Sequence, residues 1–555
     1  MSETADLAAR FLDAWFTRDP FAATSYGVPG YDHLVPDASP EGDDAWRSRV
    51  EAVLAQAAAL EAGPHDHADA ITLGCVRAHA EQQRRELESA SARYTVTAMP
   101  FDGPAQLCAL AARTVLADAA AAEAFLARLR ASGGWIDARA ERLREGAAAG
   151  LFPVARLLEQ AVSWCEQTLE PPVPAAVRAV APPDQLADPE AFCAARDTAG
   201  AEVLRPALAR YREILLELRA NARPDARAGL AHLAGGDAAY ARAVASHTTL
   251  SRTPAELHAT GLAELARLEE EMVELGAAIG LRSLPAVHEA LRASSRERSA
   301  SAAIDEALAA IRRAEARAPE VFPEPLPAPC AVTAMPPLVG ASGMAPHYTP
   351  PRLDGTRAGT FWFNLERPTA GTGWDLEGVA FHEAVPGHHL QLSRVQLLTH
   401  LPAIQRQRSV TAFSEGWGLY AEQLAEEMGL YSDERALLGA RAAAAMRACR
   451  LVVDTGLHAL GWSRGQALDF FLAHTPMPPE FLAAEIDRYL CIPGQALAYL
   501  TGKLELLRLR DRARQALGGD FSLAAFHAAV LDHGSLPLPV LARSVEHWIA
   551  TRTLT

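Results

Sequence analysis

Residues 382–389, with the sequence HEAVPGHH, combine three histidines and one glutamate around a Pro-Gly pair, and they give the strongest indication of fold and chemistry in the chain. Zinc in proteins binds neutral imidazoles or carboxylates at about 2 Å, and a catalytic site keeps one position for water. The usual helical arrangement, HExxH, places two histidines on one helix face with a glutamate as general base. The segment has these residue types at another spacing.

That spacing predicts a break in the helix. From His382, His388 lies six residues further on and His389 seven. On a straight helix the first points to the opposite face, and the second lies about 10 Å along the axis, too far for one ion. Pro386-Gly387 supplies an interruption, because proline breaks the hydrogen-bond ladder and glycine permits unusual backbone angles. The alternative is a chance histidine cluster at a helix end.

A third ligand is expected in the segment SEGWGLYAE, residues 414–422. Glu415 and Glu422 are seven residues apart and share a helix face, so one could bind a metal while the other orients a liganding histidine. A solvated amphipathic helix is the alternative, although Gly416, Trp417 and Gly418 are unusual choices for an exposed helix. The other His-Glu pair, His288-Glu289, has no second histidine nearby and is interpreted as a pair on a helix surface.

Helical periodicity dominates the rest of the chain. Thr253 to Glu256 form a capping box that predicts a long helix to about Ala278. Further helices are expected at 104–150, 200–222, 414–428, 434–459, 465–473 and 494–515. The proline-dense residues 321–351 predict irregular chain, and Gly359 to Leu365 predict a strand. The expected fold is mainly α, with a small β patch beside the site.

Two helical halves are expected, residues 1–225 and residues 226–555, as lobes of one continuous unit with the histidine segment in the second. The chain has 555 residues, a net charge of −16 and a single lysine, which argues against a nucleic-acid partner. Seven cysteines without a CxxC pattern favour reduced thiols. With no apolar run long enough for a membrane span, we expect a cytoplasmic protein without a membrane partner, and the oligomeric state stays open.

Several polar residues are candidates for a supporting role. Arg450, Asp454 and His458 are spaced four residues apart on one helix, and either orient a ligand, grip a substrate carboxylate or form an interhelical salt bridge. Tyr489 and Tyr499 flank a Pro-Gly-Gln sequence, although a tyrosine is more often a core residue than a catalytic one. The strand with the sequence FWFN either adds an extended substrate at its edge or is simply buried.

The chain resembles the bacterial domain-of-unknown-function 885 family over most of its length. The resemblance is carried by five segments: FAATSYGVPGYDHL (21–34), HEAVPGHHLQ (382–391), SEGWGLYAE (414–422), CRLVVDTGLHALGWS (449–463) and RYLCIPGQALAYLTG (488–502). The resemblance implies a large helical, zinc-peptidase-like fold and does not imply a substrate.

More remotely, the segments are similar to helical gluzincin peptidases of the angiotensin-converting enzyme and carboxypeptidase Taq families. Their HExGH pattern has a glycine before the second histidine, which implies His388 as the ligand and His389 beside the site, where it could contact substrate or Glu422. Glu415 is similar to the liganding glutamate of zinc aminopeptidases. Arg488-Tyr489 is similar to an Arg-Tyr pair whose tyrosine stabilises an oxyanion.

These indications predict a zinc-dependent hydrolase of peptide or other amide bonds. Zinc held by His382, His388 and Glu415 would activate a water molecule, with Glu383 as the base and Tyr489 at the oxyanion. Two other functions stay open: a metalloenzyme acting on a non-peptide, small-molecule amide, and a metal-free binding or structural protein on a peptidase scaffold.

Overall fold

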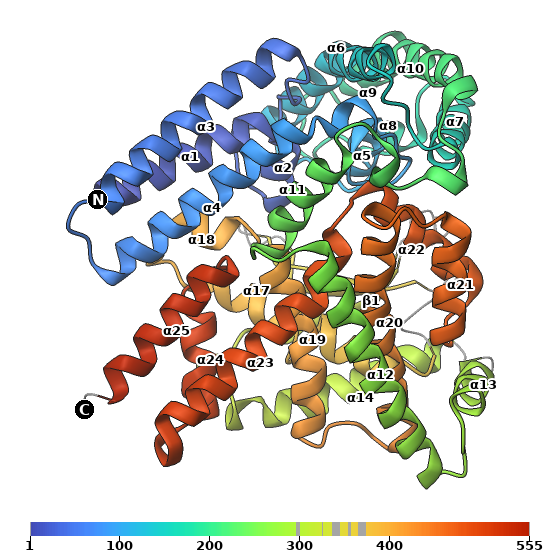
Figure 1. The fold of residues 1–555 in the computed structure, drawn as a ribbon. Coiled ribbons are helices and arrows are strands. Elements are labelled where there is room, and N and C mark those ends of the chain that lie inside the picture. Colours follow the sequence, from blue (N-terminus) through green and yellow to red (C-terminus); the bar gives the residue numbers. More distant parts are fainter. Residues whose placement is uncertain are drawn as a thin grey trace. The chain divides into compact units, whose positions relative to one another are not determined.

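The computed structural model describes residues 2–295, 300–324, 326–335, 345–352, 357–364 and 373–553. These residues are mainly helical, with one three-stranded sheet, which confirms the predicted fold class (Figure 1). Within these ranges, no helix is both long enough and apolar enough to cross a membrane.

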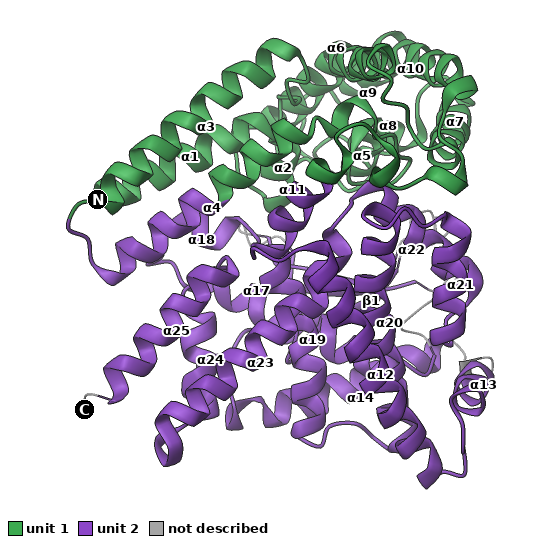
Figure 2. Ribbon diagram, viewed as in Figure 1, with its two compact units in different colours: residues 1–63, 79–239 green, residues 64–78, 240–555 purple. Residues whose placement is uncertain are grey.

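The chain forms two compact units (Figure 2). The first comprises residues 1–63 and 79–239, and the second comprises residues 64–78 and 240–555. Helices α4 (His67–Ser89) and α11 (Gly236–Thr248) contribute residues to both units. The remaining helices of the first unit are α1 (Glu3–Arg18), α2 (Pro20–Tyr26), α3 (Pro40–Glu61), α5 (Gly103–Ala111), α6 (Ala119–Ala148), α7 (Ala155–Leu169), α8 (Ala175–Arg178), α9 (Pro189–Ala199) and α10 (Arg205–Leu218).

Two of the helices expected in the first unit are divided. The predicted helix over 104–150 is α5 and α6, because Asp118 starts a new helix by accepting a hydrogen bond from the Ala121 N–H at 2.8 Å. The predicted helix over 200–222 is α10, preceded by a single π-helical turn, Gly200–Leu204. The two differences come from local capping and a change of helical pitch, and the buried face of the unit is still built as the periodicity indicated.

The second unit carries the histidine segment. Its remaining helices are α12 (Pro254–Ala278), α13 (Leu284–Ser295), α14 (Ala300–Arg317), α16 (Leu376–Glu383), α17 (His388–Leu397), α18 (Ala403–Gln407), α19 (Thr411–Glu427), α20 (Glu434–His458), α21 (Arg464–His474), α22 (Pro479–Cys491), α23 (Ala498–Leu517), α24 (Leu523–Leu531) and α25 (Leu538–Thr553). The capping box at α12 is present, with the Glu256 carboxylate accepting from the Thr253 N–H at 2.8 Å.

Two close helix pairs organise this unit, α12 with α20 and α19 with α23. Glycine makes both approaches possible. A Cβ atom on Gly261 of α12 would lie 2.8 Å from the Leu451 Cβ of α20, and one on Gly416 of α19 would lie 2.5 Å from the Gly502 Cα of α23. The second crossing places the start of α23 directly against the helix that carries Glu415.

The sheet consists of β1 (Ala331–Ala334), β2 (His347–Thr349) and β3 (Thr360–Phe363), in the order β1-β3-β2. β1 pairs parallel to β3, and β2 pairs antiparallel to it. The expectation that 321–351 is irregular throughout is therefore wrong, because two of its segments pair with β3; residues 325 and 336–344 lie outside the described residues. β3 is the strand expected at 359–365, of which Leu365 is not described.

The position of β3 also corrects the edge-addition hypothesis for the FWFN strand. Both edges of β3 are paired, and Phe361 and Phe363 are fully buried. Its backbone groups are occupied by the neighbouring strands, so the buried alternative is the correct one. β2 and its residue Tyr348 are what the sheet brings to the site.

Candidate metal centre

The predicted break in the histidine segment is present. α16 ends at Glu383 and α17 begins at His388, with residues 384–387 between them. The chain folds back tightly enough that a Cβ atom on Gly387 would collide with the carbonyl oxygens of Phe381 and His382. Trp417 of α19 donates its Nε1–H to the Pro386 carbonyl at 3.0 Å, which fixes the break against the helix that carries the third ligand.

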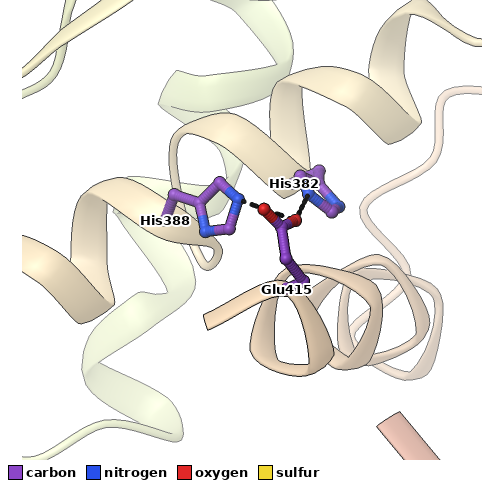
Figure 3. A group of neighbouring side chains, drawn as sticks. All are labelled: His382, His388 and Glu415. Carbon is purple, nitrogen blue, oxygen red and sulfur yellow. Dashed lines mark ion pairs between the residues drawn. The ribbon is translucent and has the colours of Figure 1, made fainter. Parts of the chain in front are cut away.

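His382, His388 and Glu415 converge from α16, α17 and α19 (Figure 3). The Glu415 Oε2 lies 3.6 Å from His382 Nε2 and 3.5 Å from His388 Nε2. Zinc at about 2.0–2.2 Å from each donor, with tetrahedral angles, would separate neighbouring donors by about 3.3 Å. The three side chains therefore have the donor types and the spacing that one zinc ion requires. The structure brings His388, and not His389, into this group.

The centre is largely buried. The side chains of His382 and His388 are 5% and 11% exposed, and that of Glu415 is 21% exposed. Among the described residues only these three side chains are grouped as ligands, so a metal bound by them would keep a fourth position for water or a substrate. Three protein ligands with an open position are typical of catalytic rather than structural zinc.

Glu422 orients His382 from behind. The Nδ1 of His382 donates to the Glu422 carboxylate at 2.8 Å, and Arg447 donates to the same oxygen at 3.3 Å. This bond fixes the His382 tautomer with Nε2 free to bind a metal. The expectation that one of the two glutamates of α19 binds and the other supports therefore matches the geometry. The suggested contact of Glu422 with His389 is not formed; Glu422 bonds to His382.

Gly418 leaves the room that the His382 ring occupies. A Cβ atom at this position would lie 2.5 Å from His382 Cε1 and 2.6 Å from its Nε2. Each residue of the Gly-Trp-Gly sequence in α19 therefore has its own structural role. Gly416 allows the close approach of α23, Trp417 bonds to the break between α16 and α17, and Gly418 leaves space for the His382 ring.

The charges of the centre favour a bound cation. Burial lowers the pKa of His382, but its hydrogen bonds with Glu415 and Glu422 outweigh burial and raise it to about 9. Burial raises the pKa of Glu415, but His382 and His388 bring it well below its ordinary range. The carboxylates thus hold a positive charge at this position, and a divalent metal would satisfy them in place of a proton.

Glu383 lies next to the ligands without joining them. Its carboxylate accepts a hydrogen bond from the backbone N–H of Tyr348 in β2, at 2.8 Å. The side chain is only partly buried. Strand β2 therefore positions the candidate base. This hydrogen bond joins residues 35 positions apart in the sequence, and local sequence patterns do not indicate it.

His389 is turned away from the ligands. Its Nε2 lies 2.6 Å from the Ala328 carbonyl oxygen and therefore donates to it, which leaves Nδ1 to accept from the Tyr348 hydroxyl at 3.0 Å. One ring nitrogen therefore holds α17 to Tyr348 of β2, and the other holds it to the chain just before β1. His389 supports the same tyrosine whose backbone positions Glu383.

A second polar cluster lies between α20, α22 and the start of α23. Its centre is Glu485, which sequence analysis did not single out. The Glu485 carboxylate accepts hydrogen bonds from Arg450 at 2.9 Å, from Arg488 at 3.0 and 2.9 Å, and from the Tyr489 hydroxyl at 2.9 Å. Glu485 precedes Arg488 and Tyr489 by one helical turn, so the i, i+3 and i, i+4 spacing was the available signal.

The two candidate tyrosines have different environments. Tyr489 is fully buried and its hydroxyl proton is committed to Glu485, which argues against the predicted oxyanion role. Burial raises the pKa of Tyr499, and the charge of Glu415 raises it further. Tyr499 is also only partly buried.

Asp454 and His458 hold the backbone around the second cluster. Asp454 accepts hydrogen bonds from the Tyr240 hydroxyl at 2.5 Å and from the Gly494 N–H at 3.0 Å. His458 Nε2 lies 3.1 Å from the Tyr489 carbonyl oxygen. The three candidates of α20 therefore each contact a different partner, and the Arg450–Glu485 pair is the interhelical salt bridge that was one of the alternatives.

The second His-Glu pair is not a surface pair. His288 is 4% exposed, whereas Glu289 points to solvent. Its place on the apolar face of α13, next to the buried Val287 and Leu291, explains the burial, and the interpretation from sequence is corrected.

These observations define a mainly helical protein with a buried two-histidine, one-glutamate centre that fits a zinc ion. The chain belongs to the family described as bacterial protein of unknown function (DUF885), whose model matches residues 20–545. No curated protein matches it.

Two solved structures are similar over the whole chain. One, described as "the putative lipoprotein from Colwellia psychrerythraea", is 26% identical, covers 99% of each chain and has a TM-score of 0.88. The other, a "putative lipoprotein of unknown function" from Shewanella oneidensis, is 17% identical, covers 98% of this chain and 99% of its own, and has a TM-score of 0.76. The second likeness concerns the fold alone.

Proposed function

We propose that this protein is a zinc-dependent hydrolase of amide or peptide bonds. The observation that carries the proposal is the convergence of His382, His388 and Glu415, with donor separations of 3.5 and 3.6 Å and a partly exposed glutamate next to them. A structural zinc site would be closed by four protein ligands, whereas three ligands beside a free carboxylate suit water activation.

In this proposal a bound zinc ion supplies a water molecule of lowered pKa and polarises the substrate carbonyl. Glu383, held by the Tyr348 N–H, accepts the proton of the attacking water and returns it to the leaving amine. Glu422 keeps the His382 ring oriented. Tyr499, and not Tyr489, is the phenol we assign to the developing oxyanion, because it lies on α23 one turn before the crossing with α19 next to Glu415, while the Tyr489 hydroxyl is bonded to Glu485.

The order of these residues supports a relationship to the helical gluzincins. A His-Glu pair, a Gly-His pair and a later glutamate helix follow one another in that order, with two additional residues between the histidines. The break at 384–387 accommodates the additional residues, since it lets His382 and His388 face one ion. We include this relationship in the proposal.

The test begins with bound metal. Purified protein should carry about one zinc ion per chain by elemental analysis, and His382→Ala and Glu415→Ala should each lose it. His288→Ala is the matched control, because it removes the buried histidine of the other His-Glu pair. Stoichiometric zinc in both ligand variants would exclude the centre.

Activity is the second part of the test. The zinc-loaded protein is incubated with a mixture of short peptides and of non-peptide acylated amines, and the products are identified by mass spectrometry. Cleavage that disappears in Glu383→Gln supports the proposal. Cleavage of the acylated amines alone would identify a small-molecule amidase, and an absence of cleavage by zinc-loaded protein across both sets would reject the hydrolase.

A further inference from the structure

The cluster around Glu485 lies next to the metal centre and is incompletely paired. We infer that Arg450 recognises a substrate carboxylate, so that the amide bond to be cleaved lies close to a free carboxylate, as in the C-terminal residue of a peptide or in an N-acyl amino acid. This inference rests on the proposed hydrolase function and specifies its substrate class.

The path from the metal centre to Arg450 runs through Tyr499. The crossing of α19 and α23 at Gly416 and Gly502 brings together the segment that carries Glu415 and the segment that carries Tyr499, one turn before Gly502. The guanidinium carbon of Arg450 stacks over the Tyr499 ring, 4.4 Å from its centroid. Through Tyr499, Arg450 is therefore linked to the helix crossing next to which Glu415 stands in the sequence.

The two arginines of the cluster are paired very differently. Arg488 donates twice to Glu485 and also to the Gln495 side-chain oxygen. Arg450 donates to Glu485 only through Nη2. Arg450 is only 8% exposed, and its Nε and Nη1 atoms are buried. Neither atom has a hydrogen-bond partner within the part of the chain that the structure describes. Buried N–H groups of a cation are costly when unpaired, so these atoms indicate a missing acceptor.

The charges of the cluster indicate what that acceptor is. Arg450 and Arg488 carry two positive charges, against one negative charge on Glu485, whose pKa the arginines hold well below its ordinary value although burial raises it. Burial raises the pKa of Asp454 to about 7, so this carboxyl group is about half ionised at neutral pH and offsets only part of the second positive charge. A net positive charge is left over in the cluster. A monoanionic carboxylate matches it, and guanidinium and carboxylate form strong charge-assisted hydrogen bonds.

The experiment measures binding separately from turnover. The probes are N-acetyl-L-alanine and N-acetyl-L-alaninamide, which differ only in the carboxylate, and each is titrated by calorimetry or ligand-observed NMR into the zinc-loaded full-length Glu383→Gln variant, which should keep the metal but not cleave the probes. We expect the acid to bind more tightly than the amide by about tenfold or more. This comparison needs no substitution at position 450, so it decides the matter even if such a substitution impairs folding.

The variants assign the effect to the residue. Arg450→Gln should remove the preference for the acid, and Arg450→Lys should restore part of it, since lysine keeps the charge but not the planar donors. Arg435→Gln, on the exposed first turn of the same helix, is the matched control and should bind as wild type. Equal binding of both probes, binding of neither, or an unchanged preference in Arg450→Gln would overturn the inference.

Peptides with free and amidated C-termini separate this inference from the proposed function. Equal cleavage of both forms would reject the carboxylate site and leave the hydrolase intact. Selective binding of the acid without cleavage of any substrate would reject the hydrolase and retain the site.

Discussion

The two polar clusters of the second unit are incomplete in opposite senses. Around His382 and His388, the carboxylates Glu415 and Glu422 create a demand for positive charge. Around Glu485, Arg450 and Arg488 leave an excess of it. Each cluster is buried, where an uncompensated charge is expensive. The neighbouring helices α19 and α23 connect the two clusters, because α19 carries Glu415 and α23 carries Tyr499, over which Arg450 stacks. This difference supports the two proposals made above, a metal cation at the first cluster and an anionic substrate group at the second.

The largest expected effect separates the two adjacent histidines. His388→Ala should abolish zinc binding, because it removes one of three ligands, whereas His389→Ala should keep zinc, because that ring bonds to Ala328 and Tyr348. Zinc content by elemental analysis, after dialysis against a weak chelator, distinguishes them. The reverse result would show that the break absorbs three residues and that His389 is the ligand.

The second prediction concerns the candidate base. Glu383→Gln should retain zinc and lower turnover about 10²- to 10⁴-fold, since it removes a proton acceptor while its amide oxygen can still accept the Tyr348 N–H. The measurement is kcat on whichever substrate the screen identifies, with zinc content determined in parallel. Unchanged turnover would exclude Glu383 as the base.

The third prediction tests how the metal cluster is supported from behind. Glu422→Gln should weaken zinc about 10- to 100-fold, because it weakens the hydrogen bond that orients His382. Gly418→Ala should do the same by placing a methyl group against the His382 ring. Gly134→Ala, in the middle of α6, is the matched control, since nothing lies within 4 Å of its added Cβ. Zinc competition with a chromophoric chelator measures the affinities, and wild-type affinity in both site variants would contradict the account.

How much the sequence alone could predict depends on the range of each contact. The break between His382 and His388 follows from helix geometry and Pro386-Gly387, so local arguments were sufficient. Glu415 and Glu422 lie on one helix face for the same reason. The hydrogen bond from Tyr348 to Glu383 could not be predicted, because it depends on the pairing of β2 with β3 across a proline-rich segment.

For two residues, the type of side chain alone did not predict its environment, because the environment depends on neighbouring residues. Tyr489 follows an arginine in the manner of an oxyanion tyrosine, but its hydroxyl donates a hydrogen bond to Glu485, four residues earlier. His288 has a charged neighbour, yet its helix face is apolar and buries it. In both cases a neighbour on the same helix decides the environment. Similarly, no local pattern indicates that residues 64–78 pack with the second unit, since this depends on tertiary contacts.

The smallest effect on either cluster is expected from Asp454, which accepts hydrogen bonds from Tyr240 and Gly494. Burial raises its pKa from 3.8 to about 7, so the folded protein holds a proton that the unfolded chain releases near pH 4. Stability from this residue is therefore greatest below pH 4 and declines as the pH rises to about 7. Asp454→Asn keeps an acceptor oxygen but does not titrate.

Between pH 5 and 7, wild type should therefore lose stability relative to Asp454→Asn, by at most about 1.4 kcal/mol per pH unit. Zinc and N-acetyl-L-alanine should bind the variant as they bind wild type, because Asp454 touches neither ligand set. Urea unfolding of both proteins at several pH values makes the measurement. Parallel stability curves would mean that Asp454 is already ionised in the folded protein, which would cancel the excess positive charge and remove one reason for an anionic substrate.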